Sequence, residues 1–164
     1  MGRLELVIET DNVSIFSPKF NGEEMTEFEK FLLNNGNYEE PQLKKDFDAI
    51  LSAINKIQND CGARENLFRL EGGCIKAIPL FIEWPRKRSL GTIRLYCIRI
   101  SERLLILGNG GIKKTKTYEK DPFLGTIVND LRRIESIIRN KSRIVHCDYD
   151  DYEEIKHILS TINI

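Results

Sequence analysis

The pattern of apolar and polar positions in the first 20 residues predicts a β-hairpin. Residues 4–9 (LELVIE) are rich in β-branched and aliphatic side chains, and residues 13–17 (VSIFS) have a similar apolar content. Asp11-Asn12 stands between the two segments and is a turn-forming pair. We therefore expect two antiparallel strands here, which extend the sheet built by the rest of the chain.

Two amphipathic helices are predicted next. After the turn at Asn21-Gly22, apolar residues recur at spacings of 3, 3 and 1, and the triplet at 34–36 (NNG) predicts a left-handed stop. Pro41 suits the first turn of a longer helix, which is predicted to end near Cys61-Gly62. The apolar face of this second helix consists of Leu43, Phe47, Ile50, Leu51, Ile54 and Ile57. Both helices are expected to pack with their apolar faces against a sheet.

The second half of the chain has the pattern of a meander followed by helices. Residues 68–70 are a short strand candidate, and the glycines and prolines of residues 71–91 predict a long irregular connection. Residues 92–100 (TIRLYCIRI) and 103–107 are predicted strands, joined by a tight turn at Ser101-Glu102. Helical spacing returns after Asp121-Pro122 and again in residues 151–162. This order predicts one α+β domain, with helices packed on a small twisted antiparallel sheet.

Composition agrees with a single globular domain, and the distribution of charge adds a feature. The chain has 164 residues, 41% of them hydrophobic and 30% charged, with a formal net charge of zero. Residues 1–60 carry 6 Lys/Arg against 12 Asp/Glu, whereas residues 86–120 carry 10 against 2. This basic centre is what a phosphate-binding face would produce, and a solvated surface is the other interpretation.

Several classes of function are disfavoured by the sequence. No apolar run is long enough to cross a bilayer, and the first residues (MGRLELVIET) contain acids where a signal peptide would be apolar. The four cysteines are widely spaced and form no CxxC pair, so neither a zinc site nor a redox motif is predicted. We therefore expect a cytoplasmic protein with reduced thiols.

A family resemblance is carried by three segments: residues 68–73 (FRLEGG), 91–100 (GTIRLYCIRI) and 103–118 (RLLILGNGGIKKTKTY). In their order, and in the run GIKKTKTYEKDP (111–122), they resemble the RelE/HigB superfamily of bacterial type II toxins. The resemblance covers roughly residues 40–120. It implies a RelE-like fold over the single domain 1–164, with extensions at 1–40 and 121–164.

The resemblance also implies an activity. Toxins of this family are mRNA endoribonucleases that act on the ribosome without a metal or other cofactor, and a cognate antitoxin, in some cases a helix-turn-helix protein, restrains them. Attack of the RNA 2′-hydroxyl on the adjacent phosphate needs cations and a proton-transfer group. The resemblance assigns catalysis to Arg94, Lys113, Lys116 and Tyr118, and RNA binding to Arg69, Arg99 and Lys114.

The residues themselves refine this assignment. Period-2 geometry puts Arg94 and Arg99 on opposite faces of one strand, and Arg94 is the better site candidate because Ile93, Leu95 and Cys97 would share a core face. The glycines of residues 108–111 predict a bulge or turn rather than a nucleotide-binding loop. The chain also departs from the family in its acidic first 40 residues and in residues 142–164. The alternative function is a non-catalytic RelE-like protein that binds nucleic acid or an acidic protein partner.

Overall fold

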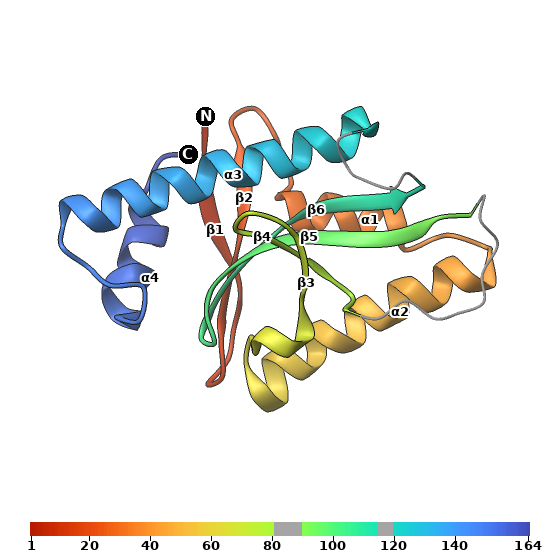
Figure 1. The fold of residues 1–164 in the computed structure, drawn as a ribbon, viewed down its shortest axis with the longest axis horizontal. Coiled ribbons are helices and arrows are strands. Elements are labelled where there is room, and N and C mark those ends of the chain that lie inside the picture. Colours follow the sequence, from red (N-terminus) through yellow and green to blue (C-terminus); the bar gives the residue numbers. More distant parts are fainter. Residues whose placement is uncertain (81–89, 115–119) are drawn as a thin grey trace.

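A computed structural model describes residues 1–80, 90–114 and 120–164, and these residues form an α+β fold with four α-helices and one six-stranded mixed sheet (Figure 1). The strands are β1 (Gly2–Glu9), β2 (Ser14–Phe20), β3 (Arg69–Gly72), β4 (Ile75–Ile78), β5 (Thr92–Ser101) and β6 (Leu104–Lys113). The helices are α1 (Glu27–Asn35), α2 (Pro41–Lys56), α3 (Pro122–Ile144) and α4 (Tyr152–Thr161). The strand order is β1-β2-β6-β5-β4-β3.

The N-terminal hairpin joins the central sheet, as predicted, but it does so through a parallel pairing. Strand β2 pairs with β6 from Ser14–Leu104 to Phe16–Ile106, and the other neighbouring strands are antiparallel. The expectation of a wholly antiparallel sheet was therefore wrong. The pairing stops two residues before Pro18, which has no N–H to donate to a neighbouring strand.

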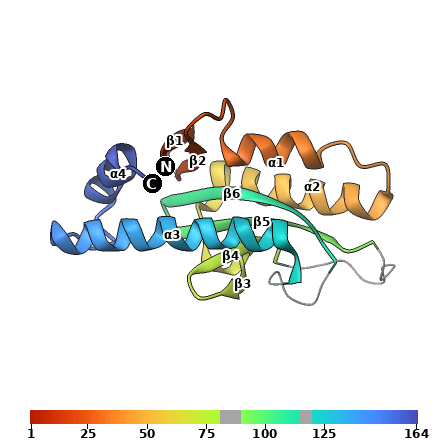
Figure 2. The same ribbon diagram turned by 90° about the horizontal axis from the view of Figure 1, so that it is seen from above.

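Helices cover both faces of this sheet (Figure 2). One core contains side chains of α1 and α2 packed on the sheet, including Phe31, Leu43 and Ile50. The other core lies beneath α3 and α4 and includes Leu131 and Leu159. Strands β5 and β6 are therefore buried on both sides, which explains their nearly continuous apolar sequences. No helix in the described part of the chain is long and apolar enough to cross a membrane.

The two N-terminal helices form where the hydrophobic pattern predicts them. Thr26 begins α1 with a capping box, in which its side chain accepts from the Glu29 amide and the Glu29 carboxylate accepts from the Thr26 amide. The predicted left-handed stop was wrong, because Gly36 has φ −82° and donates its amide to the Leu32 carbonyl. Pro41 opens α2, whose last turn widens into a π-helical segment at Ile57–Cys61. The second helical segment therefore ends close to the predicted Cys61-Gly62.

One strand lies in a stretch that was predicted to be irregular. Strand β4 forms a hairpin with β3 across Gly72 and Gly73, whose φ angles of 129° and 59° favour glycine. Four residues are too short for an alternating pattern to show, and β4 is buried between β3 and β5. The hairpin brings β3, with Arg69 and Glu71, to one edge of the sheet.

Candidate nucleic-acid interface

The alternation of side chains along β5 places Arg94 on the face of the sheet that α3 covers. Ile93 and Leu95, the residues on either side of it, pack in the core with α1 and α2, whereas Tyr96 packs in the core beneath α3. Arg94 is paired in register with Gly111 of β6. Its side chain is only 2% exposed. A guanidinium buried to this degree needs partners of opposite charge.

The partner is Glu71, a carboxylate that the sequence analysis did not single out. Its Oε1 lies 3.6 Å from Nε of Arg94 and 3.9 Å from Nε of Arg69, and its Oε2 accepts a hydrogen bond of 3.1 Å from Nζ of Lys113. The Glu71 side chain is 5% exposed. Three cations from β3, β5 and β6 therefore converge on a single carboxylate.

This cluster has an excess of positive charge and unused hydrogen-bonding groups. Among the described residues, Nε and Nη1 of Arg94 and Oε1 of Glu71 are buried with no hydrogen-bond partner. Burial lowers the pKa of the Arg94 guanidinium and the nearby charge of Arg69 lowers it further, while the charge of Glu71 opposes both effects. An anion that accepted hydrogen bonds from the free N–H groups of Arg94 would satisfy those groups and would also offset the excess of positive charge. Phosphate oxygens have the geometry that a guanidinium fork binds best.

The other predicted site residues on the lysine segment fall into two groups. Lys113 points to Glu71, whereas Lys114, the next residue, is exposed. This divergence follows from the two-residue period of a strand. Lys116 and Tyr118 lie outside the described residues. The structure thus brings together Arg69, Arg94 and Lys113 from the predicted set.

Arg99 lies on the opposite face from Arg94, as the two-residue period predicts. Its Nε donates a hydrogen bond of 2.5 Å to the carbonyl of Ala63, and its Nη1 lies 3.5 Å from Oε1 of Glu65. Ala63 is a buried member of the core with α1 and α2. Arg99 therefore links the segment after α2 to β5. Its side chain points away from the face that carries the cluster around Glu71.

The glycines of β6 allow close backbone and helix approaches and form a bulge, as predicted. The register between β5 and β6 shifts between Leu95–Gly110 and Cys97–Leu107. A Cβ atom on Gly110 would lie 1.8 Å from the carbonyl oxygen of Arg94. The amides of this stretch are not a phosphate-binding loop, since the strand continues to Lys113 without a following helix.

The sequence contained one signal for Glu71. Arg69 and Glu71 are two residues apart, a spacing that puts both side chains on the same face of a strand, although the strand candidate was predicted to end at residue 70. The proximity of Glu71 to Lys113 follows only from the position of the hairpin of β3 and β4 relative to the rest of the sheet. Among the described residues, no group of three or more His, Cys, Asp or Glu side chains is arranged to hold a metal ion.

Comparison with known proteins gave no matching family model, no matching curated protein and no matching solved structure. The resemblance to RelE/HigB toxins therefore depends on the residues of this chain alone.

Proposed function

We propose that this chain is a RelE/HigB-like toxin of a type II toxin–antitoxin system, a metal-independent endoribonuclease that cleaves mRNA on the ribosome. The observation that carries the proposal is the convergence of Arg69, Arg94 and Lys113 on one face of the sheet. The chain has a hairpin, two helices and a four-stranded antiparallel meander, with β2 parallel to β6, and this order is compatible with a RelE-like fold. The cytoplasm would be the site of action, and a partner antitoxin would cover the cationic face.

The chemistry follows from the arrangement of charges. In the proposed reaction the RNA 2′-oxygen bonds to phosphorus, the bond to the 5′-oxygen breaks, and a 2′,3′-cyclic phosphate remains. Arg94 and Lys113 would stabilise the charge that develops on the phosphate oxygens. Glu71 would accept the proton of the 2′-hydroxyl, because among the described residues it is the carboxylate that pairs with both cations. Tyr118, which the resemblance assigns to catalysis, would donate a proton to the leaving 5′-oxygen.

A second candidate is an RNA-binding protein of the same fold that does not cleave. The observation in its favour is the burial of Arg94 and Glu71, both at most 5% exposed in the side chain. A phosphate would reach the buried Arg94 only after the groups that cover it move. In this case the half-exposed Arg69 and the exposed Lys114 would make most of the phosphate contacts.

Induced expression followed by primer-extension mapping of cellular transcripts tests the proposal. The wild-type chain is expected to arrest growth and to produce discrete new 5′ ends. Lys113→Ala and Arg94→Lys are expected to abolish both effects at equal protein level, since Arg94→Lys keeps the charge and loses the planar fork. Lys114→Ala, next to Lys113 but exposed, is the matched control and should retain most of the cleavage.

Two outcomes would separate the candidates. Intact transcripts together with RNA binding that Lys113→Ala weakens would favour the non-cleaving protein. Intact transcripts and no measurable RNA binding by the folded wild-type chain would overturn both.

A further inference from the structure

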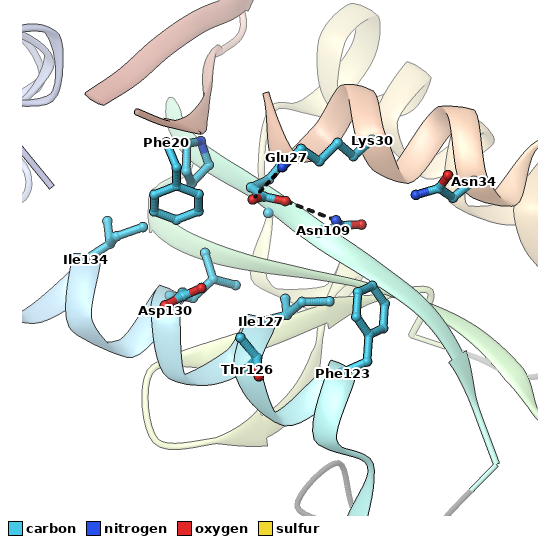
Figure 3. A pocket seen from close by; sticks show the side chains of 13 residues that line it. Phe20, Glu27, Lys30, Asn34, Asn109, Phe123, Thr126, Ile127, Asp130 and Ile134 are labelled. Carbon is cyan, nitrogen blue, oxygen red and sulfur yellow. Dashed lines mark hydrogen bonds and ion pairs between the residues drawn. The ribbon is translucent and has the colours of Figure 1, made fainter. Parts of the chain in front are cut away.

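A cavity of about 240 Å³ lies between α1 and α3, beside β6 (Figure 3). It opens where β2 leaves β6, beyond the last parallel pair Phe16–Ile106. Its apolar wall is formed by Pro18, Phe20, Phe123, Ile127, Leu131 and Ile134. This site is independent of the cluster around Glu71, because none of the residues of that cluster lines it.

The bulge of β6 shapes the floor of this cavity. Gly108 allows α3 to come close, since a Cβ atom there would lie 3.0 Å from Cδ1 of Leu131. Asn109 turns toward α1, where its Nδ2 donates a hydrogen bond of 3.0 Å to Oε2 of Glu27 (Figure 3). Its own Oδ1 accepts from the Gly110 amide at 2.7 Å. Asn109 is buried and fixed at both ends, so the carboxylate of Glu27 is held in one position.

The charged groups around the cavity are predominantly acidic. Glu27 of α1 and Asp130 of α3 lie on its two walls, and Lys30 is the one cation among the described lining residues. The Lys30 ammonium is shared, at 3.3 Å from Glu23 and 3.4 Å from Glu27. The Asp130 side chain is 41% exposed, and its ion pair with Arg133 is long, with 4.0 Å between Oδ1 and Nη2. The mouth therefore favours a cation over an anion.

Both carboxylates also retain room for another donor. An ionised carboxylate has about four acceptor positions. Among the described residues, Glu27 uses two of them, one for Asn109 and one for Lys30. The rings of Phe20 and Phe123 supply flat apolar surface in the wall of the same cavity (Figure 3), and aromatic faces attract cations.

We propose that this cavity binds a small organic cation. The ligand would carry an amidinium or guanidinium group on a flat apolar body. The group would donate hydrogen bonds to Glu27 and Asp130 while its body packs between the aromatic and aliphatic side chains. The volume lies below the roughly 300–1,000 Å³ of pockets for drug-sized ligands, so one ring or one long side chain fills it. The cation belongs either to a free amine-like metabolite or to an arginine side chain of a protein partner.

A titration of the full-length ¹⁵N-labelled protein with benzamidine tests this proposal. Saturable shifts are expected at the amides of Gly108, Asn109 and Asp130, with a dissociation constant of about 1 mM for a ligand of this size. Benzamide has the same shape without the charge, and it should bind about tenfold more weakly. Benzoate should not bind. Equal binding of benzamidine and benzamide, or no saturable shift with benzamidine, would overturn the proposal.

Substitutions locate the charge that matters. Asp130→Asn and Glu27→Gln should each reduce benzamidine affinity by about three- to tenfold and leave benzamide binding unchanged. Asp130 is exposed, so its substitution should leave the fold intact even where Glu27→Gln disturbs the contact with Asn109. Glu39→Gln removes an exposed carboxylate from the loop after α1 and is the matched control. A loss of affinity in this control equal to that of Asp130→Asn would contradict the assignment.

A second titration distinguishes the two sources of the cation. Nα-acetyl-arginine methylamide presents a guanidinium on an aliphatic chain, and its citrulline analogue lacks the charge. Binding of the arginine derivative at least as tight as that of benzamidine supports a partner's arginine side chain. Preference for benzamidine supports a free aromatic or amidine-like cation.

Discussion

Nζ of Lys113 lies 3.1 Å from Oε2 of Glu71, although two strands separate β6 from β3 in the order of the sheet. The contact requires the hairpin of β3 and β4 to bend toward the α3 side, and it closes the cluster that holds Arg94. One buried carboxylate thus contacts three cations, and the fold and the proposed site depend on the same residue.

Replacement of Glu71 is expected to destabilise the protein. Glu71→Gln keeps the size of the side chain but removes the negative charge that the buried Arg94 and Lys113 share. Loss of one partner of a buried ion pair costs about 3–5 kcal/mol, and the half-exposed Arg69 adds little. The free energy of unfolding measured by urea titration should fall by about 3–5 kcal/mol. Glu65→Gln removes an exposed partner of Arg99 and should change it by less than about 1 kcal/mol.

The same variant gives a test of anion binding. Inorganic phosphate should raise the midpoint of thermal unfolding more for Glu71→Gln than for the wild-type chain, because the ligand would take the place of the missing carboxylate. An equal rise in both proteins would indicate that phosphate binds elsewhere.

Arg99 is expected to matter for stability and not for RNA. Arg99→Ala removes the hydrogen bond to the buried carbonyl of Ala63, and hydrogen bonds from charged groups contribute about 1.5–3 kcal/mol. Urea unfolding should show this loss, and RNA affinity of the folded variant should stay within twofold of wild type. Arg64→Ala, an exposed residue in the same segment paired with Glu102, serves as the control. A tenfold loss of RNA affinity in Arg99→Ala would return Arg99 to the interface.

The sequence predicted the elements whose hydrophobic period is long enough to show. Helix α2 contains five of the six apolar positions predicted at helical spacing, and its start at Pro41 follows from proline chemistry. Strand β4 was missed because its four residues follow two glycines and carry no period. Which strand would pair in parallel with β2 was not predictable either, since Ser14 and Leu104 are separated in the sequence by α1, α2 and strands β3 to β5.

The candidate site was predictable in part for a similar reason. Arg94 could be chosen over Arg99 because strand geometry divides the two faces, and this division depends only on neighbours in the sequence. Glu71 could not be placed, because its contacts with Arg94 and Lys113 are long-range and depend on the bend of an edge hairpin. The cavity beside Gly108 arises from helix packing, which leaves no pattern in the sequence of β6 alone.

Glycine at position 110 is expected to be required for the bulge. Gly110→Ala would put a Cβ atom 1.8 Å from the Arg94 carbonyl oxygen, so β5 and β6 would have to separate at the site. We expect a loss of more than about 3 kcal/mol, or failure to fold. Gly108→Ala is the graded comparison, since its Cβ would meet the movable side chain of Leu131 at 3.0 Å. A smaller loss in Gly110→Ala than in Gly108→Ala would contradict this account of the bulge.

Tyr149 is expected to make stability fall at alkaline pH. Burial, followed by the nearby charge of Glu135, raises the pKa of its hydroxyl from 10.0 to about 12. The folded state therefore holds the proton that the unfolded chain releases, so the contribution is complete below pH 10 and is lost as the pH rises toward 12. Because Tyr149 is only partly buried, the loss should be at most about 2 kcal/mol.

Tyr149→Phe isolates this effect from other groups that titrate in the same range. Phenylalanine retains the packing against the core beneath α3 and removes the hydroxyl, which donates to Oε1 of Glu135 at 3.4 Å. The free energy of unfolding of both proteins can be measured by urea titration between pH 9 and pH 12. The stability of the wild-type chain relative to Tyr149→Phe should fall as the pH rises, because only the wild-type chain has the tyrosine to ionise. A difference that stays constant across this range would show that Tyr149 ionises equally in the folded and unfolded states.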